Sequence, residues 1–210
     1  MFLRNDLGFG LDLSAKDTNQ QNASYDTKNL EFQPYVVFPL GEESKIRIEY
    51  SIAKTDLSNA VNVGSIITNE VNEGEITSSS IGFVFSHDTR PLKGSYEDGV
   101  IYRLGQQFIG LGGDKTGLKT TFKAVVQKNT FRDDLKLSAE FEGGILTFTE
   151  GNSRVVDRFF LSSRKMRGFE PGGVGPRECL DGVCGVSKND ALGGENFAVA
   201  RFEAKFPLGL

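Results

Sequence analysis

The sequence predicts an all-β chain that folds as an antiparallel transmembrane β-barrel. Three features of its 210 residues indicate this class. Apolar and polar residues alternate along most of the chain, glycine and phenylalanine are abundant at 25 and 17 residues, and short and long connections alternate. Successive side chains of a strand point to opposite faces, so the alternation gives each strand one apolar and one charged face.

The alternation is clearest in residues 45–52, where Ile46, Ile48, Tyr50 and Ile52 are separated by polar residues. Residues 135–142 and 201–206 repeat the pattern. Extended along the chain, it predicts eight strands. They cover approximately residues 2–14, 28–39, 45–55, 77–87, 99–110, 117–130, 134–149 and 196–207.

The connections between the predicted strands differ in length. Residues 41–44, 91–98 and 132–134 form short or moderate turns, whereas residues 15–27, 56–76 and 150–195 form long loops. Short turns at one end and long loops at the other are typical of an up-and-down outer-membrane barrel. The short link at residues 112–114 is the exception to this pattern.

The polar face of the predicted strands carries charges of both signs. This suits a hydrated barrel interior, because unpaired charge in a dry core is costly. A soluble secreted β-sandwich binding module is the alternative, and it would turn Ile46, Ile48, Phe202 and Phe206 toward a protein core. The charged face consists of Arg47, Glu49, Lys119, Lys123, Lys136, Glu140, Glu142, Arg201, Glu203 and Lys205.

The composition argues against several functional classes. The net charge of −4 disfavours a nucleic-acid binder, which needs clustered Lys and Arg. The single histidine, His87, disfavours a histidine-based metal centre or hydrolytic triad. Gly172-Gly173-Val174-Gly175 lacks the Gly-Lys-Ser/Thr ending of a phosphate-binding loop. We therefore expect no enzymatic activity, no metal site and no cofactor.

Several motifs gather in residues 160–210. Met166-Arg167-Gly168-Phe169 is followed by Gly-x-Gly-Pro-Arg at residues 173–177, by Asp190-Ala191-Leu192-Gly193-Gly194 and by Phe206-Pro207-Leu208-Gly209, with a weaker match at Asp88-Thr89-Arg90-Pro91. Together they resemble the bacterial surface antigen family, the outer-membrane protein assembly factors of the BamA type.

The resemblance implies a barrel of about sixteen strands, of which residues 1–210 would form an internal part, roughly the fifth to the twelfth. The first and last four strands and the POTRA domains would then lie outside this sequence. It also implies that the protein folds and inserts other β-barrel proteins into the bacterial outer membrane. Its partners would be unfolded outer-membrane protein clients, accessory assembly lipoproteins and outer-membrane lipid. A related translocation or secretion pore, TamA-like or of the two-partner type, is the alternative within the family.

In this family, the longest loop, here residues 150–195, folds back into the barrel. The resemblance implies that Arg167 meets an acidic residue of the inner wall, and Glu203 stands at the position of that partner. Gly168 would allow a close backbone approach or a positive φ, and Phe169 would supply apolar anchoring area. The alternative is that Arg167 is a solvated loop residue.

Cys179 and Cys184 lie in the same loop. Their spacing is not that of a usual zinc half-site, and Asp181-Gly182 between them favours a turn that would let the two sulfurs meet. The family often carries a cysteine pair here, so we expect a small disulfide loop rather than free thiols.

Overall fold

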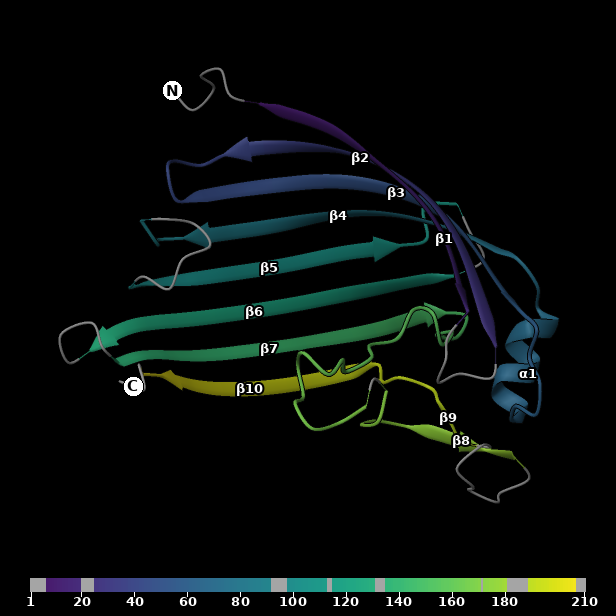
Figure 1. The fold of residues 1–210 in the computed structure, drawn as a ribbon. Helices are drawn as coiled ribbons and strands as arrows, with labels where there is room; N and C mark the ends of the chain where they lie inside the picture. The colour runs from purple at the N-terminus through teal and green to yellow at the C-terminus, as the bar shows by residue number, and fades with distance from the viewer. Residues whose placement is uncertain are drawn as a thin grey trace.

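The computed structural model of the protein describes residues 7–19, 25–91, 98–112, 115–130, 135–170, 172–180 and 189–206. These residues form one antiparallel eight-stranded sheet and a separate two-stranded sheet (Figure 1). Neighbours in the large sheet follow chain order up to β7, which then pairs with β10. The predicted all-β, antiparallel architecture is confirmed.

The strands of the large sheet are β1 (Gly8–Asn19), β2 (Asp26–Pro39), β3 (Ser44–Ser58), β4 (Ile76–Asp88), β5 (Gly99–Ile109), β6 (Thr116–Thr130), β7 (Leu135–Glu150) and β10 (Asn196–Lys205). The small sheet pairs β8 (Arg177–Cys179) with β9 (Asn189–Ala191). Three predictions need correction. The predicted loop 150–195 contains the two short strands β8 and β9. The predicted polar loop 56–76 contains a helix, α1 (Ser65–Asn72), and the first strand continues to Asn19 rather than ending at residue 14.

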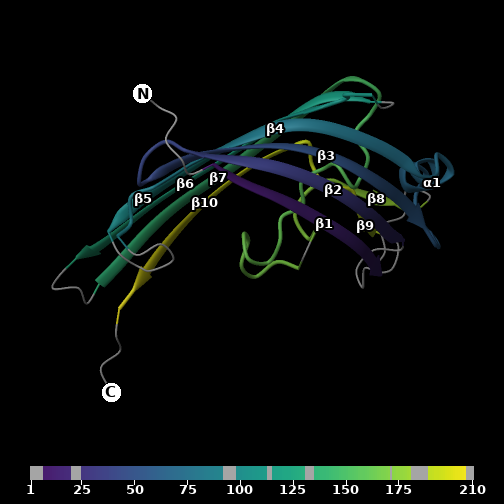
Figure 2. The same ribbon diagram turned by 90° about the horizontal axis from the view of Figure 1, so that it is seen from above.

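The large sheet is curved, and the long connection between β7 and β10 lies on its concave side (Figure 2). This connection, residues 151–195, is called the docked loop below. Short turns lie at one end of the sheet, and α1 and the small sheet lie at the other (Figure 1). Within the described residues β1 and β10 do not pair with each other, so the sheet forms part of a barrel wall.

The convex face of the sheet is apolar and open. Phe9 of β1 is 77% exposed and Phe202 of β10 is 81% exposed. The strand register places these side chains in continuous rows, such as Leu13, Phe32 and Ile52 across β1 to β3. Because Ile48 and Phe202 face outward rather than a second layer, the β-sandwich alternative is disfavoured.

Most of the buried apolar residues gather at the loop end of the sheet, where α1 meets the docked loop. We call this region the cap; its core consists of Tyr25, Leu57, Val63, Ile67, Val155 and Leu192. Ile67 of α1 and Val155 of the docked loop are almost completely buried. Across the described ranges, no helix has the length and apolar character needed to cross a bilayer.

Candidate functional site

An aromatic contact holds the start of the docked loop on the concave wall. Phe159 packs on Phe197 of β10 with ring centroids 4.8 Å apart. Both rings cover Gly144 of β7, where an added Cβ would lie 2.5 Å from Phe197 Cε1 and 2.7 Å from Phe159 Cζ. Gly144 is therefore needed for the close approach of the loop to the sheet.

A chain of ion pairs crosses the concave wall from β6 to β10. The ammonium of Lys123 lies 2.6 Å from Glu140 and 2.7 Å from Glu142, two carboxylates on the inner face of β7. On the other side, Arg201 of β10 lies 2.6 Å from Glu140. The strand alternation predicts this charged face correctly, but not which of its charges pair.

The docked loop joins this chain of ion pairs at two side chains. Arg167 Nη2 lies 2.6 Å from Glu203 Oε1, and Lys165 Nζ lies 2.7 Å from Glu142 Oε2. In addition, the guanidinium of Arg201 donates a 2.6 Å hydrogen bond to the backbone carbonyl of Arg164. The sheet therefore contacts the loop tip at Arg164, Lys165 and Arg167, of which the sequence motif indicated only Arg167.

The Arg167–Glu203 pair is asymmetric in exposure. The Arg167 side chain is 74% exposed, whereas that of Glu203 is 16% exposed. An ion pair with one solvated member typically contributes about 0–1 kcal/mol, so this contact orients the loop tip more than it stabilises it. The same oxygen of Glu203 also faces Arg201, whose Nε lies 3.5 Å from it.

The other residues of the motif have different surroundings. Gly168 adopts a φ of +88° with open space around it, so it serves the turn rather than a close approach. Met166 is half-buried and accepts a hydrogen bond from the backbone N–H of Phe169. Phe169 is 50% exposed, and the described aromatic contact with the wall is made by Phe159, so the expected anchoring by Phe169 stays a prediction.

Residues 190–194 enter β10 through the cap. Asp190 and Leu192 are buried, while Ala191 pairs with Arg177 between β9 and β8. Gly193 combines a φ of +70° with contact to the Phe160 ring, where an added Cβ would lie 2.8 Å from Cε2. Gly194 exchanges two backbone hydrogen bonds with Phe159, at 2.8 and 2.9 Å.

Arg177 and Cys179 belong to the small β8–β9 sheet. Arg177 donates to the backbone carbonyls of Gly172 and Asn189 at 2.7 and 2.6 Å, and thereby closes residues 172–177 into a compact turn. Cys179 is disulfide-bonded. Cys184, its predicted partner, lies outside the described residues, so the pairing itself stays a prediction.

The cap contains an ion pair that the sequence did not predict. Arg154 of the docked loop and Glu70 of α1 are 2% and 6% exposed, and Arg154 Nε lies 3.8 Å from Glu70 Oε2. The guanidinium also donates to the backbone carbonyls of Glu70 and Gly74. Burial raises the pKa of Glu70, and the backbone N–H of Val155 and the nearby arginines partly oppose this rise.

A carboxylate from the small sheet holds the first turn of α1. Glu178 accepts the backbone N–H of Ile66 at 2.9 and 3.1 Å and the hydroxyl of Ser65 at 3.0 Å. An acceptor at this point satisfies free N–H groups and complements the helix dipole. Glu178 lies more than 100 positions after the helix it stabilises. The local sequence of α1 therefore does not reveal this contact.

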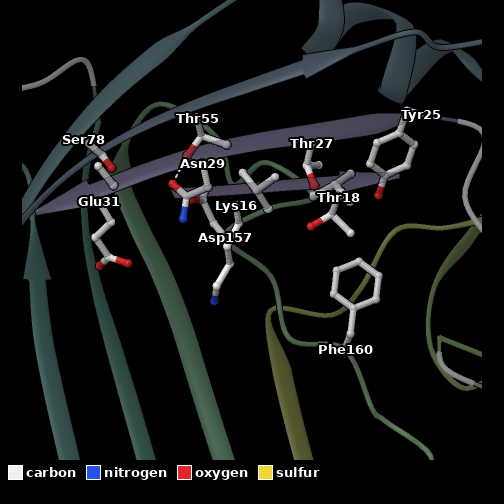
Figure 3. Close-up of a pocket in the computed structure, with 13 residues that line it drawn as sticks. Lys16, Thr18, Tyr25, Thr27, Asn29, Glu31, Thr55, Ser78, Asp157 and Phe160 are labelled. Atoms are coloured by element: carbon white, nitrogen blue, oxygen red, sulfur yellow. Dashed lines mark hydrogen bonds between the residues drawn. The ribbon is translucent and has the colours of Figure 1, made fainter. Parts of the chain in front are cut away.

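A cavity of about 360 Å³ lies between the docked loop and the concave faces of β1 to β4 (Figure 3). The sheet side is rich in hydroxyl and amide groups, including Thr18 and Asn29, and the loop side includes Phe160. Lys16 and Glu31, which also line it, make no ion pair within the described ranges. The cavity therefore offers both signs of charge to a polar ligand or to water.

Other predicted positions lie away from this cavity. At the turn end of the sheet, Arg90 donates to both oxygens of Asp88 in the Asp-Thr-Arg-Pro turn, at 2.9 and 2.8 Å. His87 lies beside Ser44 and stacks with Tyr102. In the part of the chain that the structure describes, no group of three or more His, Cys, Asp or Glu side chains could hold a metal ion.

Comparisons with known proteins agree with this architecture. The profile of the Omp85 superfamily domain matches residues 1–210. Outer membrane protein assembly factor BamA of Neorickettsia risticii is 36% identical over 109 residues, which cover 51% of this chain and 14% of that protein. The sorting and assembly machinery component 50 homolog of Xenopus tropicalis is 26% identical over 137 residues, which cover 64% of this chain and 27% of that protein.

The fold also matches a solved structure. The crystal structure of BamA from Haemophilus ducreyi lacking POTRA domains 1–3 aligns with a TM-score of 0.73 at 17% identity. The alignment covers 96% of this chain and 42% of that one. The chain thus spans less than half the length of each of these three proteins.

Proposed function

Because the chain belongs to the Omp85 superfamily, we propose that it forms barrel wall in an outer-membrane assembly factor that folds and inserts other β-barrel proteins. The apolar convex face supports a location in the bacterial outer membrane, where such a face contacts lipid. Both relatives matched by sequence are named for assembly, which favours this role over a secretion or translocation pore. The proposed role includes no enzymatic step and no cofactor.

The observation that carries the proposal is the docking of the loop on the concave wall. Arg167, Lys165 and Phe159 attach the loop to β7 and β10 through one continuous set of contacts. A barrel interior occupied in this way is poorly suited to an open diffusion channel. It suits a protein whose barrel wall assists client proteins that enter the membrane beside the barrel.

The partners follow from the same proposal. Unfolded outer-membrane proteins would be the clients, lipid would surround the convex face, and accessory lipoproteins would assist assembly. The contacts described above all lie within one chain, so they support the wall and its loop rather than the identity of any partner.

The test of the role is depletion of the full-length protein in the bacterium that encodes it. Loss of the protein should lower the amounts of folded, heat-modifiable barrel proteins in the outer membrane, and re-expression should restore them. Unchanged barrel proteins after complete depletion would contradict the assembly role.

Charge variants then test the loop. When re-expressed after depletion, Arg167→Glu and Glu203→Arg should each restore less of the folded barrel proteins than the wild type does, since each variant places like charges together. The double variant should recover part of this lost function. Arg164→Glu is the matched control, because Arg164 contacts the wall through its backbone carbonyl. Equal defects in the single and double variants would show that the pair does not act in assembly.

A further inference from the structure

A groove of about 320 Å³ lies on the convex face of the sheet, across β3 to β6. We call it the convex groove; the lining residues used in the argument are Ile48, Ile81, Phe83, Gln106, Phe108 and Leu118. Each of the four strands pairs with a described neighbour on both sides. The groove therefore belongs to continuous wall and not to a free edge of the sheet.

One polar side chain lies in the apolar surface of the convex groove. The lining residues named above are apolar except for Gln106, and the apolar ones are 36–44% exposed. The register sets Gln106 opposite Phe83 of β4 and Thr120 of β6. Leu104 and Phe108, two positions to either side on β5, share its face. The amide thus lies within the apolar face rather than beyond its border.

The amide of Gln106 makes no hydrogen bond with the described residues. The next residue, Gln107, differs in this respect, because it points to the concave face and donates a 2.7 Å hydrogen bond to Ser80. An amide that faces hydrocarbon without a partner is costly, since lipid tails neither donate nor accept hydrogen bonds. Apolar walls with one placed polar group are also typical of ligand sites.

The position of Gln106 along β5 sets its depth in the membrane. Gln106 lies three residues before Ile109, which ends β5 on the cap side. On a strand tilted by about 40°, three residues span about 8 Å of depth. Long loops are extracellular in outer-membrane barrels, so the groove faces the outer leaflet below its headgroups. At this depth the amide meets the first carbons of an acyl chain, and an unsubstituted chain offers it no partner.

We propose that the convex groove binds a 3-hydroxyacyl chain of an outer-leaflet lipid, the kind of chain that lipid A carries. The chain hydroxyl, a few bonds below the headgroup, exchanges a hydrogen bond with the amide of Gln106. The rest of the chain lies against the apolar walls, including Phe83 and Ile48. This inference rests on the proposed location in the outer membrane, and it adds the class of lipid that the wall selects.

The test is native mass spectrometry of the full-length protein in detergent micelles. The probes are two synthetic phosphatidylglycerols that share a headgroup and differ only in carrying 3-hydroxytetradecanoyl or tetradecanoyl chains. We expect the hydroxylated lipid to be retained about fivefold better, which is the effect of one typical hydrogen bond. Hexa-acylated lipid A should displace the hydroxylated probe, and failure to displace it would contradict the assignment to such a lipid.

Gln106→Leu should lower the preference to about one to one and leave retention of the unsubstituted lipid unchanged. Gln107→Leu is the matched control, because it removes the neighbouring amide from the opposite face of the same strand. This control should keep the preference for the hydroxylated lipid. Equal retention of the two lipids by the wild type, a preference that survives Gln106→Leu, or an equal loss in the control would each overturn the proposal.

Photo-cross-linking in cells tests whether the occupant is a lipid or a protein. A benzophenone side chain in place of Phe108 lies beside Gln106 on the same face of β5. Irradiation should join it mainly to lipid. A protein adduct as the main product would overturn the proposal in favour of a partner embedded in the membrane.

Heat-modifiable migration separates this inference from the proposed function. Its absence in the wild type would contradict the membrane location and this inference together, whereas a folded barrel without the lipid preference would contradict this inference alone. If Gln106→Leu does not fold, Gln106→Met provides the second variant, since it keeps the length of the side chain without the amide. It should also lose the preference, and a preference that persists would overturn the proposal.

Discussion

Both carboxylate oxygens of Glu70 accept the backbone N–H of Val155, at 3.1 and 2.9 Å. Glu70 belongs to α1, and Val155 belongs to the docked loop, 85 residues later. The same carboxylate lies beside the buried guanidinium of Arg154. One acidic side chain therefore connects α1 with the docked loop, so that the helix and the loop form one unit of the cap.

Replacement of Glu70 should loosen the cap. Glu70→Gln keeps the shape of the side chain but removes the charge beside Arg154 and weakens the acceptor for Val155. We expect a loss of about 1–3 kcal/mol in the local free energy of unfolding. The measurement is hydrogen exchange of residues 65–72 and 153–158 in the full-length protein. Glu73→Gln is the control, since Glu73 also lies 3.8 Å from Arg154 but is 55% exposed; an equal effect would contradict the prediction.

Tyr25 should make the cap sensitive to alkaline pH. Burial, followed by the nearby carboxylates of Glu70 and Asp190, raises the pKa of Tyr25 from 10.0 to about 12. The folded state thus holds the phenol proton more tightly than the unfolded state does. The resulting stability is fully present below pH 10 and is lost as the pH rises through about 12.

The shift corresponds to roughly 2–3 kcal/mol between the two protonation states. Tyrosinate absorbance during an alkaline titration should therefore show one late-ionising tyrosine, which Tyr25→Phe should remove. Stability should also fall less steeply above pH 10 in Tyr25→Phe than in the wild type. Identical titrations of the two proteins would show that the ring does not ionise late.

The contact at Gly144 should be sensitive to one methyl group. Gly144→Ala would place Cβ within 2.5 Å of Phe197 Cε1, so Phe197 or Phe159 must move. We expect about 1–3 kcal/mol of destabilisation, with faster exchange at the start of the docked loop. Gly143→Ala is the matched control, because its Cβ would meet only ordinary contacts, the nearest at 3.5 Å. If the two variants are destabilised equally, the loss of a glycine itself, rather than the lost close approach of the loop to the sheet, causes the destabilisation.

The strands could be predicted because one face of each meets an apolar environment and the other a charged one. This alternation located β3, predicted at residues 45–55 and observed at Ser44–Ser58, but it misplaced the strand ends where the pattern ends and missed the short strands β8 and β9. At the cap end of β1, Ala15 and Asp17 replace the apolar residues of the convex face, so the strand continues past the last recognisable position.

The cap could not be predicted for a different physical reason. The eight residues of α1 are stabilised by Glu178 and Val155, which are remote in sequence. No local pattern records such contacts. For the same reason, the motif at Arg167 indicated a basic loop tip near an acidic wall, whereas the neighbouring contact from Lys165 to Glu142 appears only in the folded chain.

Lys123 should be the side chain on which the attachment of the loop tip depends most. It lies between Glu140 and Glu142, and these carboxylates are also the partners of Arg201 and Lys165. Lys123→Met removes the charge but keeps much of the apolar stem, so it leaves the two carboxylates close together with one cation fewer. Their repulsion should then be relieved by movement of one carboxylate away from the wall.

We expect Lys123→Met to cost about 1–3 kcal/mol of loop attachment and to raise the exchange rate of residues 164–167. Lys136→Met is the matched control, because Lys136 lies on the same charged face of β7 and makes no ion pair with the described residues. Adding Glu140→Gln to Lys123→Met should restore part of the protection, since it removes one of the two facing charges. If Lys136→Met raises exchange as much as Lys123→Met, general loss of positive charge from the wall, rather than the bridging ammonium, governs the attachment.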